Sequence, residues 1–190
     1  MTTIFAYDTA TAVSACALIR GGEVVGQRLT EARSVLAAAD ELLRAEGLGQ
    51  SDLDALVVGT GPGSFTAIRI GLATARGLAL ALGIPTAGVS TLEAFAGGVP
   101  VIDARRGEVF SVGPAVARPA DLAVAGLRLV GDGAVRYRAL FEAAGAEVPP
   151  DADPAHLPSA ALLAARAGDF GPADAIEPLY LRAPDALASR

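Results

Sequence analysis

The sequence predicts an α/β protein built of two small lobes, each with a mixed sheet flanked by helices. Short apolar runs rich in Val and Ile alternate with longer segments of helical periodicity, and a strand–turn–helix unit lies at residues 55–82. A Gly97-Gly98 pair then precedes a second system of strands. We therefore expect an N-terminal lobe at residues 1–98 and a shortened C-terminal lobe at residues 99–190, with the tail packed back on the body.

Composition and charge narrow the class of protein. The net charge is −6 and all 15 basic residues are arginines. A protein that holds nucleic acid alone usually has a basic face, so we do not expect this chain to bind nucleic acid without a partner. The first residues carry no basic region, and Arg69 and Arg76 interrupt the most apolar segment, so we expect a cytoplasmic protein without a membrane span. The single cysteine, Cys16, lies in an apolar strand pattern and is expected in the core.

The first elements are three strands and a helix. Residues 4–7 form an apolar run that ends at Asp8, whose carboxylate can cap the following turn. Residues 13–19 and 23–29 read as strands joined by a Gly21-Gly22 hairpin turn. Residues 34–46 read as a helix that begins at a Ser34 cap and ends before Gly47. Its apolar stripe consists of Val35, Leu36, Ala39, Leu42 and Leu43.

The glycine-rich turn between the strand at residues 55–58 and the helix at residues 66–82 is the most distinctive feature. Ser64 or Thr66 can cap the helix, and the free N–H groups at its start make an anion-friendly site; a turn that serves only the fold is the alternative. The chain lacks the lysine of a Walker A loop, and Thr66 stands where a nucleophile elbow needs glycine. The turn residues are Gly61, Pro62, Gly63, Ser64 and Thr66, followed by Gly71 on the helix.

The helix at residues 66–82 carries small residues at every fourth position, namely Ala67, Gly71, Ala75 and Ala79. Such a ridge permits close packing, either on the chain's own sheet or on a helix of a second subunit. Glycine costs about 1 kcal/mol relative to alanine inside a helix, so Gly71 and Gly77 suggest a packing reason.

The second half predicts further strands at residues 86–89, 99–103, 108–112 and 127–130, and helices at residues 137–144 and 160–167. Asp103 and Arg105 are expected to form a structural ion pair. His156 lies in a loop rich in Pro and Asp and is expected at the surface. The segment after Pro178 is expected to be extended and docked on the body.

Several motifs together resemble one family. They are Ile4-Phe5-Ala6-Tyr7-Asp8-Thr9-Ala10-Thr11, Gly61-Pro62-Gly63-Ser64-Phe65-Thr66 with Arg69-Ile70-Gly71, Asp103-Ala104-Arg105-Arg106-Gly107-Glu108-Val109-Phe110, Val130-Gly131-Asp132-Gly133-Ala134 and Ile176-Glu177-Pro178-Leu179-Tyr180-Leu181-Arg182. In order and spacing this set resembles the bacterial TsaB (YeaZ) family, once labelled a glycoprotease. The resemblance implies an actin-like ATPase (ASKHA, ribonuclease H-like) fold.

The resemblance also implies a non-catalytic role. The family pairs with the catalytic subunit TsaD and supports transfer of a threonylcarbamoyl group to N6 of adenosine 37 in tRNAs that read ANN codons. The ATPase TsaE joins the complex, tRNA is bound only through the complex, and a homodimer is expected when the chain is alone. The resemblance implies that this chain holds no cofactor of its own. It also implies that ATP or ADP binds at the junction with the partners. The implied partner interface consists of Ser34, Val35, Leu36, Ala39, Leu42, Phe65, Arg69, Leu72 and Arg76.

In actin-like ATPases an acidic residue after the first strand positions metal and phosphate, and Asp8 matches that place. By this resemblance Asp8, Thr9 and Asp103 form a vestigial nucleotide site. One histidine cannot build a paired-histidine metal site, so we expect no metal. The alternative is an ATP-binding enzyme of the actin-like and sugar kinase superfold, with Asp8 and Asp103 around Mg²⁺. The sequence offers neither a metal site nor a nucleophile–base pair, so we do not expect a peptidase.

Overall fold

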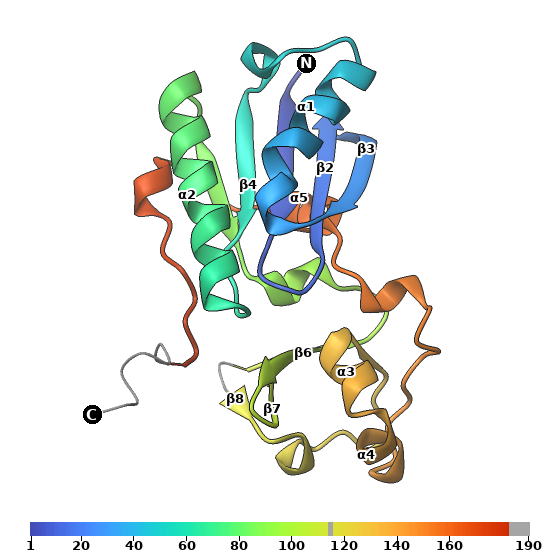
Figure 1. Ribbon diagram of the computed structural model, residues 1–190. Helices are drawn as coiled ribbons and strands as arrows, with labels where there is room; N and C mark the ends of the chain where they lie inside the picture. Colours follow the sequence, from blue (N-terminus) through green and yellow to red (C-terminus); the bar gives the residue numbers. More distant parts are fainter. Residues whose placement is uncertain (114–115, 183–190) are drawn as a thin grey trace, which may run out of the picture.

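The computed structural model describes residues 1–113 and 116–182 and contains two sheets flanked by helices (Figure 1). The first sheet has the strand order β3-β2-β1-β4-β5, and the second has the order β8-β7-β6-β9. Both sheets mix parallel and antiparallel pairs. The predicted two-sheet α/β architecture is confirmed.

The first sheet starts with an antiparallel meander and continues with parallel strands. β1 (Thr3–Asp8), β2 (Ser14–Arg20) and β3 (Glu23–Thr30) pair in sequence, and the predicted turn at Gly21 and Gly22 joins the last two. β4 (Ala55–Gly59) lies parallel to β1, and β5 (Thr86–Val89) lies parallel to β4. Parallel neighbours need crossover connections, and helices supply them here.

Helices cover both faces of the first sheet (Figure 1). The short helix η1 (Ala32–Ser34), α1 (Val35–Ala45) and η2 (Gln50–Asp52) connect β3 to β4, and α2 (Phe65–Leu82) connects β4 to β5. α1 and α2 lie on one face, where a first core gathers Phe5, Tyr7, Leu18, Leu43, Leu56 and Ile68. α5 (Ala160–Arg166) lies on the other face, over Ala6 and Ala17. Each fully buried side chain of this size contributes about 1.5–3 kcal/mol.

Within the described ranges, α2 is the helix that is long and apolar enough to cross a membrane by length and composition alone. Core helices of globular proteins satisfy the same criterion. One stripe of α2, with Ile68, Leu72 and Ala75, is buried in the first core. Its opposite face is open, and Leu80 there is 87% exposed.

The second lobe is smaller. β6 (Val99–Arg105), β7 (Glu108–Ser111) and β8 (Val116–Ala117) pair antiparallel, and β9 (Leu129–Val130) lies parallel to β6. The short helix η4 (Pro119–Asp121) precedes β9, and α3 (Asp132–Arg136), α4 (Arg138–Ala143) and η5 (Pro154–His156) follow it. The single helix predicted at residues 137–144 is therefore preceded by a separate turn of helix. A core of its own contains Val101, Val109, Leu129 and Phe141.

The chain leaves the first lobe after η3 (Thr91–Ala94) and returns at α5. The Ser159 N–H donates to the Ala94 carbonyl at 2.8 Å, so exit and return lie side by side. After α5, residues 173–182, which we call the C-terminal strap, begin with η6 (Ala173–Ala175) and run along α2 toward the second lobe (Figure 1). The docked tail that the sequence predicts is confirmed by the bond from the Leu179 N–H to the Thr60 carbonyl at 2.8 Å.

The prediction for His156 is wrong, because the side chain is buried rather than exposed. Its Nδ1 accepts a hydrogen bond from the Gly131 N–H at 3.1 Å, and its Nε2 lies 3.1 Å from the Pro149 carbonyl oxygen. With Nδ1 as acceptor, Nε2 carries the proton and donates to that carbonyl. The imidazole thus joins the turn before α3 to the loop at residues 149–156.

Candidate functional site

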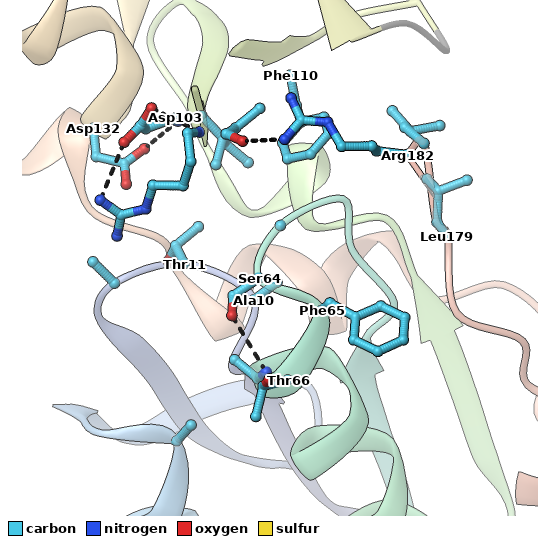
Figure 2. A pocket seen from close by; sticks show the side chains of 18 of the residues that line it. Ala10, Thr11, Ser64, Phe65, Thr66, Asp103, Phe110, Asp132, Leu179 and Arg182 are labelled. Atoms are coloured by element: carbon cyan, nitrogen blue, oxygen red, sulfur yellow. Dashed lines mark hydrogen bonds and ion pairs between the residues drawn. The ribbon is translucent and has the colours of Figure 1, made fainter. Parts of the chain in front are cut away.

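A cleft of about 620 Å³ lies between the two lobes. Ala10, Thr11, Ser64 and Thr66 of the first lobe form its floor, and Asp103 and Asp132 of the second lobe face them (Figure 2). Phe65, Phe110 and the strap residues from Leu179 to Arg182 form a side wall. The volume falls in the range of small-molecule sites, about 300–1,000 Å³.

The glycine-rich turn builds the floor. Gly61 has a φ of 101°, which favours glycine, and its bond to Pro62 is cis. A Cβ on Gly63 would lie 2.3 Å from the Ala10 carbonyl oxygen, so only glycine permits this close approach. Ser64 caps α2, as predicted, by accepting from the Ala67 N–H at 3.5 Å. Ser64 and Thr66 line the cleft at the start of α2, and anion binding there stays a prediction.

Asp8 and Thr9 lie beneath the floor and do not line the cleft. Asp8 is fully buried, accepts from the Ala10 N–H at 2.7 Å and accepts from the Thr91 hydroxyl at 2.6 Å. Burial raises the pKa of Asp8, and these two hydrogen bonds oppose the shift. The Thr91 hydroxyl also accepts from the Gly61 N–H at 3.0 Å. Asp8 therefore holds the turn from below, in the capping role that the sequence allows.

The predicted nucleotide set is not brought together. The Thr9 hydroxyl donates to the Ala67 carbonyl at 2.7 Å and fixes α2, whereas Asp103 belongs to the opposite lobe and lines the cleft. The structure thus separates Asp103 from Asp8 and Thr9. Over residues 1–113 and 116–182, no group of three or more His, Cys, Asp or Glu could hold a metal ion. Cys16 is buried, as expected, and burial raises the pKa of its thiol to about 12.

Asp103, Asp132 and Arg105 line the roof. Asp103 pairs with Arg105 at 3.4 Å, as predicted, and also with Arg136 at 3.5 Å. Asp132 accepts from the Asp103 N–H at 2.9 Å. Burial raises the pKa of Asp132, the hydrogen bond from the Asp103 N–H opposes this shift, and the charge of Asp103 adds to it. In the sequence, Asp132 appeared only within one of the family motifs, and its local signal is an acidic residue between two glycines directly after a strand.

The predicted partner interface divides into buried and exposed residues. Val35, Ala39, Leu42 and Leu72 are buried in the first core and face this chain's own sheet. The sequence correctly predicted an apolar stripe on α1. The four side chains named here are nevertheless buried within this chain and are not open to a partner. Ser34 starts α1 without a side-chain capping bond, and Leu36 is 48% exposed.

Three predicted interface residues hold the C-terminal strap. Arg76 donates to the Ala173 carbonyl at 3.4 Å and to the Ile176 carbonyl at 2.9 Å. The Arg69 guanidinium lies 3.9 Å from the ring centre of Phe65 and donates to the Tyr180 hydroxyl at 3.1 Å. The Phe65 and Tyr180 rings are 4.8 Å apart. The open surface of α2 is therefore formed by the helix together with the strap.

The strap also reaches the second lobe. Arg182 donates to the Ala104 carbonyl at 2.9 Å and forms an ion pair with Glu108. Ala104 and Glu108 both lie on the β6–β7 hairpin. The chain's last described residues thus tie the two lobes across the side of the cleft.

Comparison with known proteins agrees with this architecture. The family model described as "TsaD: tRNA N6-adenosine threonylcarbamoyltransferase" matches residues 30–119. An uncharacterized protein of Mycobacterium tuberculosis is 39% identical over 98% of this chain and 94% of its own length. YeaZ from Pseudomonas aeruginosa superposes with a TM-score of 0.77 at 27% identity, covering 95% of this chain and 100% of that chain.

TsaB of Escherichia coli is 38% identical over 56% of this chain and 52% of its own length. The chain belongs to the TsaB (YeaZ) family. Its two-lobed architecture is accordingly the actin-like ASKHA fold that the sequence predicts. The segment shared with E. coli TsaB spans about half of that relative, whereas the alignment with YeaZ covers both chains almost completely.

Proposed function

We propose that this chain is a non-catalytic subunit in the biosynthesis of threonylcarbamoyladenosine in tRNA. It pairs with TsaD and supports threonylcarbamoyl transfer to N6 of adenosine 37 in the cytoplasm, with tRNA bound through the complex. The observation that carries the proposal is the family membership, because the named relatives are tRNA threonylcarbamoyladenosine biosynthesis proteins.

The open face of α2 supports pairing through the helices. Ala73, Gly77, Leu80 and Ala81 form an exposed stripe. Among the described residues, and apart from the neighbouring backbone of α2, no atom lies within 4 Å of the position that a Cβ on Gly77 would occupy. The described part of this chain therefore offers no packing reason for Gly77, although glycine costs about 1 kcal/mol in a helix. A close approach by a partner helix supplies that reason.

Fold similarity supports TsaD as the partner. The TsaD model matches residues 30–119, which contain α1 and α2. A partner of related fold presents an equivalent helix pair, and two such pairs can pack about an approximate twofold axis. The same geometry permits a homodimer when TsaD is absent. TsaE and ATP or ADP are then expected at the junction of the subunits.

The buried setting of Asp8 supports a role without catalysis by this chain. Both of its carboxylate oxygens accept bonds from the chain's own groups, and it does not line the cleft. The position that handles phosphate in actin-like ATPases here stabilises a turn. The cleft volume favours the alternative, an ATP-binding enzyme. ATP turnover by the isolated chain that Asp103→Asn abolishes would support that alternative.

The test is size-exclusion chromatography with light scattering, on the chain alone and mixed with TsaD at micromolar concentration. We expect a 1:1 complex that replaces any homodimer. Leu80→Glu is expected to abolish the complex, because it places a charge on the open stripe, while circular dichroism shows a folded monomer. Leu157→Glu is the matched control, since Leu157 is 40% exposed and lies outside α1 and α2. Unchanged separate peaks, or equal complex formation by Leu80→Glu and the control, would refute the pairing.

A further inference from the structure

The C-terminal strap contacts three parts of the molecule in succession. Its first half lies on α2, where Arg76 donates to the Ile176 carbonyl at 2.9 Å. Its middle lies on the glycine-rich turn, where the Leu179 N–H donates to the Thr60 carbonyl at 2.8 Å. Its end lies on the β6–β7 hairpin, which Arg182 contacts. One short segment thus runs from the α2 face to the second lobe (Figure 1).

The strap lies beside the open stripe of α2. Side chains three, four and seven positions apart share one face of a helix, so Arg69, Ala73, Arg76 and Leu80 follow one line along α2. Ala73 and Leu80 are exposed. The two arginines of that line hold the strap, and Arg69 does so by donating to the Tyr180 hydroxyl at 3.1 Å. A subunit that packs on Ala73 and Leu80 would therefore meet the strap as well.

The docked strap also offers apolar surface next to this stripe. Tyr180 is 36% exposed, although its ring lies 4.8 Å from that of Phe65 and its hydroxyl is bonded to Arg69. The removal of apolar surface from water drives association. A second subunit can therefore bury more surface on α2 when the strap is docked than when it is released.

Arg182 ties the other end of the strap to the second lobe. Its guanidinium donates to the Ala104 carbonyl at 2.9 Å and forms an ion pair with Glu108. The two charged side chains are only 25% and 35% exposed, so water screens this pair less than a fully exposed one. The preceding residue, Leu181, packs against an apolar cluster that includes Ala104 and Phe110. The end of the strap is thus held by both charge and packing.

The chain crosses between the lobes at one place. It leaves the first lobe after Ala94 and returns at Ser159, and these two residues are hydrogen-bonded. Neighbouring crossings of this kind can act as a hinge between two bodies. The strap is a separate link, which forms part of the side wall of the cleft (Figure 2). Its docking therefore restrains the distance between the β6–β7 hairpin and the start of α2.

We propose that the C-terminal strap is a latch that couples the α2 face to the position of the second lobe. A subunit that packs on α2 favours the docked strap, and the docked strap holds the second lobe through Arg182. The coupling is reciprocal, because pairing stabilises the docked strap by the same free energy by which the docked strap stabilises pairing. The latch within the chain does not depend on a partner, whereas its control by TsaD rests on the proposed function.

Hydrogen exchange measured by mass spectrometry tests the latch in the isolated full chain. Arg182→Gln and Glu108→Gln remove the same ion pair from its two sides, and Arg76→Gln removes contacts at the α2 end. Arg166→Gln is the matched control. It breaks the exposed ion pair between α5 and Glu93, which lies outside the strap and the cleft lining.

Each change should be felt at the opposite end of the strap. Arg76→Gln should speed exchange in peptides that contain the β6–β7 hairpin by about fivefold or more, the lower range of coupling between sites. Arg182→Gln and Glu108→Gln should speed exchange in the peptides of residues 173–180 to a similar degree. Peptides of β1 should exchange as in wild type, which excludes global unfolding, and the control should match wild type throughout.

A strap that merely packs locally at each end is the competing explanation. It predicts that each substitution changes exchange only at its own end, and that result would overturn the latch. Similar exchange in all three variants and in the control would overturn it too.

Addition of TsaD then tests the control by the partner. Saturating TsaD should slow exchange in the β6–β7 hairpin of wild type but not of Arg182→Gln. Arg182→Gln and Glu108→Gln should weaken pairing equally, because they break the same ion pair. Weaker pairing in Arg182→Gln alone would indicate a direct contact with TsaD and refute the control. Failure of wild type to pair refutes the proposed function alone, since exchange in the isolated chain decides the latch.

Discussion

Gly77→Ala is expected to stabilise the isolated chain. Gly77 is exposed in the middle of α2, and over residues 1–113 and 116–182 no atom outside the neighbouring backbone of α2 lies within 4 Å of the place that the new methyl group would take. The substitution therefore adds no clash and removes the helix cost of glycine, a gain of about 1 kcal/mol. For a chain of this size, that gain raises the melting temperature by about 2–4 °C.

Gly71→Ala on the same helix is the matched comparison, and it is expected to lower the stability of the chain rather than raise it. A Cβ on Gly71 would lie 2.4 Å from Thr9 Oγ1, an atom that is buried and bonded to the Ala67 carbonyl. Thr9 must rotate and lose that bond, or the helix must shift. Overpacking costs about 1–3 kcal/mol, and a lost hydrogen bond adds about 0.5–1.5 kcal/mol. The gain in helix propensity offsets only about 1 kcal/mol, so the variant is destabilised.

Thermal unfolding followed by circular dichroism distinguishes the two glycines, and pairing assays add a second readout. Under the proposed function, Gly77→Ala weakens the complex with TsaD although it stabilises the monomer. A melting temperature for Gly77→Ala that falls as far as that for Gly71→Ala would show that the outer face of α2 is not open. Stabilisation with undiminished pairing would instead show that no partner helix packs at Gly77.

Three further predictions concern buried or bridging groups. The difference in unfolding free energy between Asp8→Asn and wild type should shift in favour of the variant as pH rises. The raised pKa of Asp8 makes wild-type stability fall between the unfolded and folded pKa values, by at most about 1.4 kcal/mol per pH unit, whereas Asn does not titrate; a difference that is constant with pH contradicts this. His156→Ala leaves the buried Gly131 N–H without its acceptor and should cost about 1–3 kcal/mol in denaturant unfolding, so an unchanged midpoint excludes the bond. Arg76→Ala frees the Ile176 carbonyl and should speed proteolysis of the strap, whereas an unchanged cleavage rate shows that the arginine does not hold it.

Local chemistry made parts of the fold predictable. The Gly21 and Gly22 turn and the Ser64 cap depend on residues within a few positions, and the structure confirms both. The stripe on α1 also predicted a buried face correctly. A stripe does not specify which surface covers it, however. Val35 was predicted at a partner interface, but it packs in the chain's own core.

Contacts between distant parts of the chain had no local signal. Arg69 meets Tyr180, and Arg76 meets Ile176, which lies 100 positions later. His156 looked exposed because its loop is polar, but Gly131 and Pro149 enclose it. Asp8 had a known counterpart at the same place, and only its burial under the turn showed that it does not face the cleft.

The bond between Ser159 and Ala94 has a consequence for how this chain can change in length. The second sheet is, in topological terms, an insertion whose two ends meet at one point of the first lobe. Residues can be added to or removed from such an insert without altering the sheet that carries it, because neither end has to move. A short linker from Ala94 to Ser159 would therefore join the first lobe to α5 directly.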